Sequence, residues 1–508
     1  MSLEPRPEYT DAELAGLYPP QLRLQQVQVL LRHGERTPVS TRFLNAGLPP
    51  HWPYCSAVRQ LRAAVLDGPP PSTPAGDPPR RTFSKVEWRQ RLETFGRDDD
   101  SPVVAAGPNG ELDAICDAGM LTDRGRETTH ALGARLRRLY VDRLGFLPPS
   151  IDNDDAFYLR ATPIPRALES MQQAFHGLYP PHTRAPAFPP LTILSRPVAD
   201  ENLFPNEGSC RRLAELARAF AQRTADRWNT SNDMAYVNTR IGKWMPDSSP
   251  RVAVDSRPRL SGVMDTINAT RAHGPVTRLP KEFYDPGVRK IIEKIGTEEW
   301  FAGYRESREY RALGIGSLLG DLVSRMVLSA EQASPDLPKK NTAGSAPFRF
   351  GLNGCHDTTL GAILTSLGAF SFDKWPPFTS HIAIELFRSA EHESPRGNSN
   401  TPARSWWPPA ILGTSSARGI GRKPSSELSD KEKESLQGYF VRLRYNDEPV
   451  AIPGCRPQGK HLDGDETFCT LEAFKAIVDK FTPQNWKQEC RLNIKMPAFP
   501  PGDETAGH

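Results

Sequence analysis

Short apolar runs that end at glycine, proline or polar turns recur along this chain and predict buried β-strands. Three of these runs cover residues 27–31, 156–159 and 347–353. The first is rich in valine and leucine, as is typical of a strand that is buried on both faces. Residues 380–388 and 440–445 predict two more strands, the second with alternating polar and apolar positions.

Apolar residues at helical spacing lie between these strands. They form a stripe over residues 122–142, where Thr122 or Asp123 is placed to cap the start of a helix. Residues 168–178 predict a second helix, residues 360–367 a third, and residues 471–481 a fourth. Strands that alternate with helices indicate an α/β core.

The pattern changes between residues 189 and 346, where amphipathic helical stripes occur with little strand-like alternation. We expect a mostly helical cap over 189–346, inserted into a core that consists of residues 20–188 and 347–495. Two stretches interrupt the core: a Pro-rich one at about 65–82, and one rich in Ser, Gly, Pro and charge at about 394–433. Their composition predicts flexible insertions.

Composition places the chain among globular proteins. It has 508 residues, of which 38% are hydrophobic and 24% charged, with a formal net charge of +4. This balance excludes global disorder, and the scattered basic residues do not indicate binding to nucleic acid.

Targeting signals are weak. Residues 1–20 lack the basic start and apolar stretch of a signal peptide, and no run reaches the ~18 apolar residues that a membrane-spanning helix needs. We therefore expect a cytoplasmic protein without a membrane span. Two glycosylation sequons, at Asn229 and Asn268, would suit secretion instead.

Seven cysteines in a chain of this length do not suggest a disulfide framework, and an odd number leaves at least one unpaired. Cys455 and Cys469 are the first candidates for a pair, because both lie in a loop-rich C-terminal segment. Without an oxidising compartment we expect them to stay thiols.

Candidate chemistry follows the first predicted strand, where His33 is flanked by Arg32 and, after Gly34 and Glu35, by Arg36. Ligands of open α/β sheets bind at the carboxyl ends of the strands. Arginine forks match phosphate oxygens, and a neutral imidazole is a nucleophile toward phosphorus. This stretch therefore predicts phosphoryl chemistry.

Residues 32–38, Arg-His-Gly-Glu-Arg-Thr-Pro, resemble the RHGxRxP signature of the histidine acid phosphatases. His356-Asp357, at the start of a predicted helix, resembles the HD motif of the same family. A GxLTxxG element at 119–125 and an NDEP turn at 446–449 are also similar to family elements. The resemblance spans roughly residues 24–495, with the two insertions unmatched.

The resemblance implies a core similar to that of phosphoglycerate mutases, with a mainly parallel sheet, helices on both faces and a helical cap. It implies that His33 is the nucleophile that forms a phosphohistidine and that Asp357 is the proton donor. The remaining site residues are expected to hold phosphate: Arg32, Arg36, Arg160 and His356.

Arg160 follows the strand at 156–159, whereas its competitor for the third arginine, Arg166, lies in the next helix. We prefer Arg160, because a strand end would direct it at the pocket. We interpret Glu35 and Cys355 as structural, and we interpret the other histidines considered in the same way. An aspartic acid as proton donor favours an acidic optimum, since its ordinary pKa is about 3.9.

The predicted function is a metal-independent acid phosphatase that acts on phosphate monoesters. A phytase would need basic cap residues that face the cleft, and the cap offers several: Arg271, Arg278, Lys281, Arg289 and Lys290. A lysophosphatidic acid phosphatase would need an apolar channel. A non-catalytic phosphate-binding regulatory protein would need neither His33 nor Asp357, and a phosphomutase fits the long cap poorly.

No cluster of metal ligands is visible in the sequence, and we expect no cofactor. The expected partner is a small phosphate ester. The sequence makes no prediction about oligomeric state.

Overall fold

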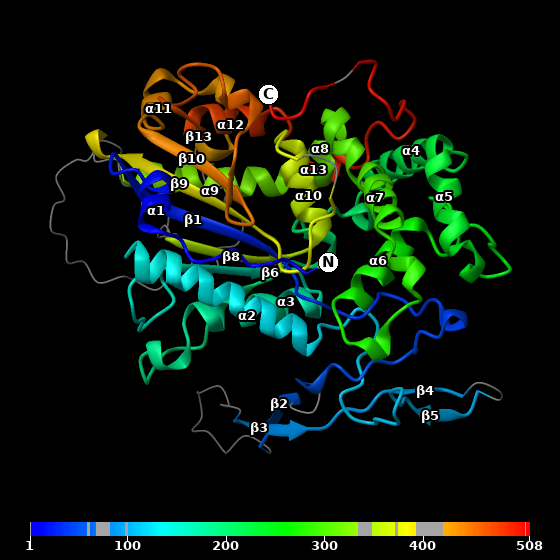
Figure 1. Ribbon diagram of the computed structural model, residues 1–508. Helices are drawn as coiled ribbons and strands as arrows, with labels where there is room; N and C mark the ends of the chain where they lie inside the picture. The colour runs from blue at the N-terminus through cyan, green and yellow to red at the C-terminus, as the bar shows by residue number, and fades with distance from the viewer. Residues whose placement is uncertain are drawn as a thin grey trace, which may run out of the picture.

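Strand β1 (Leu22–Arg32) lies in the middle of the main sheet. The computed structural model describes residues 2–57, 61–67, 82–96, 100–333, 348–370, 374–392, 420–502 and 504–508. Its main sheet has the strand order β12-β13-β10-β9-β1-β8-β6-β7, with β11 paired to β10 (Figure 1). Strands β1, β8, β6 and β7 are parallel, and β9, β10, β13 and β12 extend the sheet in antiparallel fashion. The α/β fold with a parallel region is confirmed, within a mixed sheet.

The remaining strands of this sheet are β6 (Phe157–Ala161), β7 (Ile193–Leu194), β8 (Phe350–Cys355), β9 (His381–Ser389), β10 (Tyr439–Tyr445), β11 (Glu448–Val450), β12 (His461–Leu462) and β13 (Asp465–Thr470).

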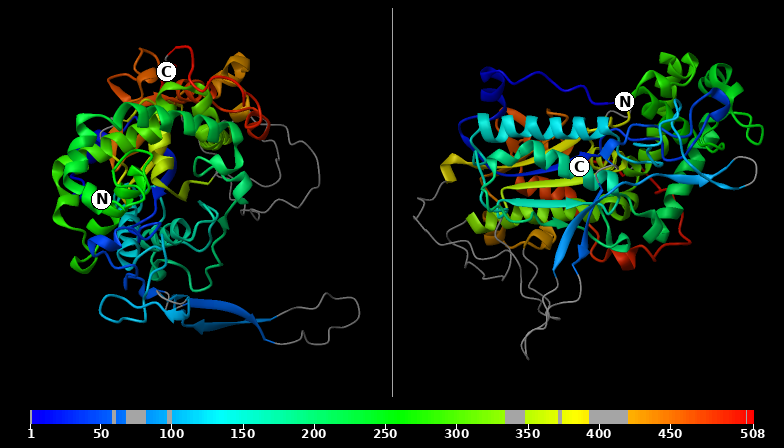
Figure 2. Two further views of the ribbon diagram at one scale, coloured as in Figure 1. Left: turned by 90° about the vertical axis from the view of Figure 1, so that its right-hand side faces the viewer. Right: turned by 90° about the horizontal axis from the view of Figure 1, so that it is seen from below.

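Helices α2 (Asp123–Arg137) and α3 (Pro165–Leu178) cover one face of the sheet (Figures 1 and 2). They pack against each other, and α3 contacts β1, β6 and β8. Val29 and Leu31 of β1 are buried in the core on this face. Of the two residues considered for the cap of α2, Thr122 or Asp123, the structure has Thr122, whose side chain accepts a hydrogen bond from the backbone N–H of Gly125.

Helices α9 (Ser317–Ala333), α10 (Asp357–Ser366) and α12 (Leu471–Asp479) cover the opposite face. Leu30 points into this second core, because successive side chains of a strand alternate between faces. Gln28 extends the contact to α9, donating a hydrogen bond to the carbonyl of Leu322 at 3.0 Å.

The cap is helical, as expected, and stands beside the carboxyl ends of β1, β6 and β8 (Figure 1). Its helix α7 contacts the other cap helices and α10, which joins the cap to the core. Toward the end of the expected cap range, α9 packs on the sheet, and the last residues of that range, 334–346, lie outside the described residues. The cap helices are α4 (Arg211–Trp228), α5 (Asn232–Ile241), α6 (Leu260–Arg271), α7 (Pro286–Glu306) and α8 (Arg308–Arg311).

One helical stretch, Arg308–Gln332, has the length and apolar composition of a membrane-spanning helix. Of its apolar window, 67% is buried inside the protein, as in a core helix.

Two ribbons that the sequence pattern did not predict lie outside the main sheet (Figures 1 and 2). One pairs β2 (Leu61–Leu66) with β3 (Phe83–Trp88), and the other pairs β4 (Glu93–Phe95) with β5 (Pro102–Val104). The expected Pro-rich insertion falls mostly outside the described residues. So does most of the expected insertion at 394–433, although its described end contains α11 (Asp430–Glu434). Two further short α-helices are α1 (Asp11–Leu17) and α13 (Trp486–Glu489).

Six of the seven cysteines form disulfides, so the expectation that the chain lacks a disulfide framework is wrong. The predicted pair Cys455–Cys469 is present. The other two pairs join residues far apart in sequence, which spacing alone does not reveal: Cys55–Cys116 and Cys210–Cys490. The second ties the start of α4 in the cap to the C-terminal segment. Cys355 remains a buried thiol.

Candidate active site

The two predicted motifs meet because β1 and β8 are parallel neighbours. Arg32 is in register with Cys355, so both strands end at the same edge of the sheet. The backbone N–H of His33 donates to the carbonyl of Cys355 at 3.2 Å. Residues that follow each strand, His33 on one and His356 and Asp357 on the other, therefore lie side by side, with the two imidazole ring centres 5.6 Å apart.

Two glycines allow the first motif to lie against the start of α2. A Cβ atom on Gly34 would lie 2.3 Å from the carbonyl oxygen of Gly125, and one on Gly125 would lie 2.2 Å from that of Glu35. Thr122 completes the contact, because its hydroxyl donates to the Glu35 carbonyl at 3.0 Å. The GxLTxxG element thus supports the loop that carries His33 and Arg36.

His33 is almost fully buried, at 1% exposure. Its Nδ1 lies 2.9 Å from the carbonyl oxygen of Gly34. Because a carbonyl only accepts, this contact places the ring proton on Nδ1 and leaves the lone pair on Nε2. Burial lowers the pKa of His33 well below its usual value, and the charges of Arg166 and Arg36 lower it further. The imidazole is therefore neutral and nucleophilic at Nε2.

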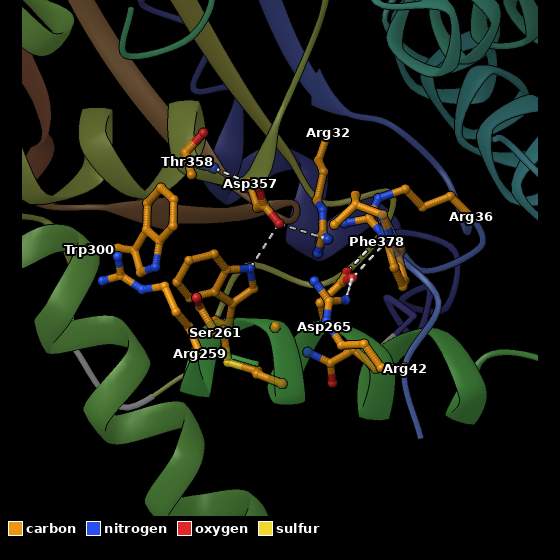
Figure 3. A pocket seen from close by; sticks show the side chains of 15 residues that line it. Arg32, Arg36, Arg42, Arg259, Ser261, Asp265, Trp300, Asp357, Thr358 and Phe378 are labelled. Carbon is orange, nitrogen blue, oxygen red and sulfur yellow. Dashed lines mark hydrogen bonds and ion pairs between the residues drawn. The ribbon is translucent and has the colours of Figure 1, made fainter. Parts of the chain in front are cut away.

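Asp357 is the first residue of α10 and faces Arg32 (Figure 3). Its Oδ2 lies 2.8 Å from a guanidinium nitrogen of Arg32 and accepts a hydrogen bond from the indole N–H of Trp375 at 2.9 Å. Burial alone would raise the pKa of Asp357, but Arg32, Arg36 and the Trp375 hydrogen bond together hold it below its ordinary value.

Three arginines surround His33: Arg32, Arg36 and Arg166. Each has a buried Nε–H that finds no hydrogen-bond partner in the protein. Burial lowers the pKa of Arg166 to about 10, and the positive charge of Arg36 contributes to this. Buried like charges with unpartnered donors are costly unless an anion joins them, so the cluster fits an oxyanion ligand.

Arg160 lies elsewhere, although we predicted it for this pocket. Its guanidinium forms a fully buried ion pair with Glu201 and donates to Asn202 at 2.9 Å. Ala161 is buried in the core on the α2–α3 face, and side chains alternate along β6, so Arg160 points to the opposite face. Arg166 instead projects from the first turn of α3 toward the arginine cluster.

His356 caps the start of α10, and its Nε2 lies 3.1 Å from the hydroxyl of Thr162. Burial lowers its pKa, and the charge of Arg166 adds to this effect. The His356 ring thus lies beside His33 and Asp357, with its Nε2 held by the Thr162 hydroxyl.

A cleft of about 310 Å³ opens beside Asp357 and the arginines (Figure 3). Four residues at i, i+3, i+4 and i+7 place one face of α6 along this cleft: Ser261, Met264, Asp265 and Asn268. Trp300 of α7, Trp375 and Phe378 supply aromatic walls. Asp265 reaches back to Arg36, with an oxygen–nitrogen distance of 2.7 Å.

Within the described ranges, no group of three or more His, Cys, Asp or Glu side chains is arranged to hold a metal ion. The positive charges at the site are those of the arginines.

Comparison with known proteins agrees with this geometry. A family model of the histidine phosphatase superfamily (branch 2) matches residues 23–446. The chain belongs to this superfamily. The assignment that the two motifs suggested, to phosphomonoester hydrolases of the histidine acid phosphatase type, is confirmed.

Relatives of this histidine phosphatase include a probable acid phosphatase of Schizosaccharomyces pombe. The two are 35% identical over 479 residues, which cover 93% of this chain and 95% of the relative. A human lysophosphatidic acid phosphatase type 6 is 27% identical over 372 residues, covering 73% of this chain and 75% of that protein.

Among solved structures, the phytase of Hafnia alvei in complex with tartrate aligns with a TM-score of 0.50 and 13% sequence identity. The alignment covers 93% of this histidine phosphatase and all (100%) of the phytase chain. At this identity the likeness concerns the fold alone.

Sequence reasoning missed three residues of the site: Arg166, Asp265 and Trp375. Arg166 was weighed and set aside. Helical spacing places Asp265 on the face of α6 opposite buried Val263 and Ile267, but nothing local in the sequence shows that this face lies along the cleft. Trp375 lies in a connection between α10 and β9, where no periodicity indicates which side chains point inward.

Proposed function

We propose that this chain is a metal-independent acid phosphatase that hydrolyses phosphate monoesters through a phosphohistidine on His33. One observation carries the proposal. A neutral, buried imidazole with its lone pair on Nε2 lies among three arginines whose Nε–H groups have no protein partner. A site that binds and transfers a phosphoryl group needs both a nucleophile and hydrogen-bond donors to the phosphate oxygens.

Four side chains bind phosphate in this proposal: Arg32, Arg36, Arg166 and His356. These arginines would hold the non-bridging oxygens and stabilise the charge of a metaphosphate-like transition state. Arg166 takes the role that we first assigned to Arg160, because its charge acts directly on both His33 and His356.

Two displacements make up the proposed reaction. Nε2 of His33 attacks phosphorus in line, the bond to the ester oxygen breaks, and Asp357 gives its proton to the departing alkoxide. The Asp357 carboxylate then accepts a proton from water as the water oxygen attacks phosphohistidine, which releases phosphate and restores neutral His33.

An acidic optimum follows from the charges around Asp357. In the free protein Arg32 and Arg36 hold the pKa of this carboxyl below its ordinary value. A bound phosphate dianion neutralises those arginines, so the pKa of Asp357 rises and the proton that the first step needs is retained at mildly acidic pH.

The cleft favours small esters with a single phosphate over inositol polyphosphates. A phytase activity requires cationic cap residues at the cleft. The five considered from the sequence are not among its lining, and Arg259, the cap arginine that does line it, is paired with Glu299: Arg271, Arg278, Lys281, Arg289 and Lys290 are the five. The lining instead contains Trp300, Trp375, Phe378 and Met264.

A lysophospholipid monoester is the second candidate. The aromatic walls offer apolar surface to the part of the leaving group next to the phosphate. The human relative that is named a lysophosphatidic acid phosphatase supports this alternative. A purely phosphate-binding role is disfavoured, because it explains neither the oriented lone pair of His33 nor the placement of Asp357.

We also propose that the protein works in an oxidising compartment, in place of the cytoplasmic location expected from the sequence. Three disulfides support this proposal, because such bonds persist where thiols are not kept reduced.

The test is the release of phosphate from p-nitrophenyl phosphate between pH 4 and 8 in EDTA, for the wild type and His33→Ala. We expect turnover by the wild type that is highest at acidic pH and is lost in the variant. Turnover that requires an added metal, or that survives in His33→Ala with a normal circular dichroism spectrum, would contradict the proposal.

A further inference from the structure

Asp265, on α6, brings a cap carboxylate to the arginine cluster. Its Oδ1 lies 2.7 Å from Nη1 of Arg36, and its Oδ2 lies 3.3 Å from Nη1 of Arg42. Oδ2 also accepts a hydrogen bond from the backbone N–H of Val39 at 3.1 Å. The side chain is 13% exposed, so these contacts fix its position at the edge of the cleft.

This carboxylate changes the charge of the leaving-group side of the cleft. Beyond the phosphate position, Arg42 and Arg259 are the described cationic side chains that line the cleft. Asp265 pairs with Arg42, and Glu299 pairs with Arg259 at 2.5 Å. Each of these two arginines therefore already faces a carboxylate, which weakens its attraction for a second anionic group of the substrate.

The walls that remain on this side suit an uncharged leaving group. Trp300 and Trp375 meet edge to face with ring centres 6.2 Å apart, and Met264 lies on the same face of α6 as Asp265. A second phosphate placed here would meet apolar surface, and the carboxylate of Asp265 would offset the attraction that Arg36 and Arg42 exert on it; both effects disfavour it.

We propose that Asp265 is a specificity-determining residue that excludes esters with a second anionic group near the scissile phosphate. This inference rests on the proposed function and refines its substrate class to monoesters whose leaving group is uncharged or cationic. Asp265 acts from the cap, so it filters the leaving group while Arg32 and Arg166 retain the transferred phosphoryl group.

A simple structural role makes a different prediction. If Asp265 only locked the cap to the core or oriented Arg36, its removal would change the binding of every phosphate compound in the same proportion. A filter against a second anionic group instead changes the ratio between the Kd of a ligand with one such group and the Kd of a ligand with two.

The experiment compares four proteins: wild type, Asp265→Asn, Asp265→Glu and Asp247→Asn. Asp247 is an exposed cap carboxylate outside the cleft, so its variant controls for the loss of one negative charge. Isothermal titration at pH 5 gives the Kd of inorganic phosphate and of methylenediphosphonate, which carries a second anionic group that cannot be hydrolysed off.

We expect the preference for methylenediphosphonate over phosphate to rise at least about tenfold in Asp265→Asn, since a unit charge about 8 Å away has an effect of that order at an effective dielectric constant of about 20. Asp265→Glu keeps the carboxylate and should retain the wild-type ratio of the two Kd values. Asp247→Asn should leave this ratio unchanged. The ratio of kcat/KM for inositol hexakisphosphate to that for p-nitrophenyl phosphate should rise in the same variant.

An unchanged ratio in Asp265→Asn, or an equal rise in Asp247→Asn, overturns the inference. So does a wild type that binds methylenediphosphonate more than tenfold tighter than phosphate, a result that needs no variant. Failure of the proposed function can be told apart from failure of this inference. If the wild type does not turn over p-nitrophenyl phosphate, both Kd values can still be measured by titration.

Discussion

Removal of one hydrogen bond to Asp357 should move the pH dependence of this enzyme in a defined direction. The indole N–H of Trp375 donates to Oδ2 of Asp357 at 2.9 Å, and this bond stabilises the ionised carboxylate. In Trp375→Phe the bond is lost while an aromatic ring still fills the space. The pKa of Asp357 must then rise, because the charged form has lost a donor.

The size of the effect follows from the environment of the carboxylate. A hydrogen bond to a charged group contributes about 1.5–3 kcal/mol. Since the Asp357 side chain is 16% exposed and keeps its ion pair with Arg32, the lower end applies. At 1.36 kcal/mol for each pKa unit, the limb of the kcat profile that reports Asp357 should move to higher pH by about one unit.

The assay is the kcat of glycerol 2-phosphate hydrolysis from pH 3 to 8, read as released phosphate, because its alkoxide leaving group depends on the proton of Asp357. Trp300→Phe is the matched control, because Trp300 lines the same cleft and, in the part of the chain that the structure describes, makes no hydrogen bond to Asp357. A limb that stays in place or moves to lower pH in folded Trp375→Phe would refute the assignment of Asp357 as the titrating acid.

The remaining predictions concern the arginines and the disulfides. In Arg166→Ala, kcat/KM should fall by about 10²–10³-fold with little change in thermal unfolding. Arg160→Ala should instead lower the free energy of unfolding by about 3–5 kcal/mol, because Glu201 is left buried and unpaired, and equal losses of activity from the two variants in folded protein would contradict our placement. Titration of the denatured, unreduced protein with a thiol reagent should find one thiol per chain, that of Cys355, and several thiols would exclude the disulfides. Replacement of Cys455 and Cys469 by Ser should lower stability by about 3 kcal/mol, as expected for a loop that spans 14 residues, and unchanged denaturant unfolding would show that this bond is absent.

The sequence predicted the parts of the site that depend on regular structure. The apolar runs before His33 and His356 identified β1 and β8, and the ends of parallel neighbours must lie at one edge of a sheet. The start of α2 at Thr122 or Asp123 followed from their side-chain oxygens and the helical stripe behind them, and the cap is Thr122.

Long-range contacts set the limit of this reasoning. Arg160 and Arg166 are both close to a strand end in sequence. Alternation along β6 places Arg160 opposite Ala161, but only the packed sheet shows that the side of Arg160 faces Glu201 and not the site. Cys210 and Cys490 are 280 residues apart, so local pattern does not link them. Asp265 meets Arg36 because the cap folds over the core, a docking that no local periodicity encodes.

The most direct test of the account is to trap the phosphorylated enzyme. Asp357→Asn removes the group that accepts a proton from water, so the second step should slow more than the first with p-nitrophenyl phosphate, whose leaving group needs little protonation. The variant, mixed with this substrate, quenched in alkali and digested, should carry a phosphoryl group on the peptide that contains His33. A phosphoryl group on any other residue, or turnover by Asp357→Asn without a phosphorylated His33 at any time point, would contradict the central claim.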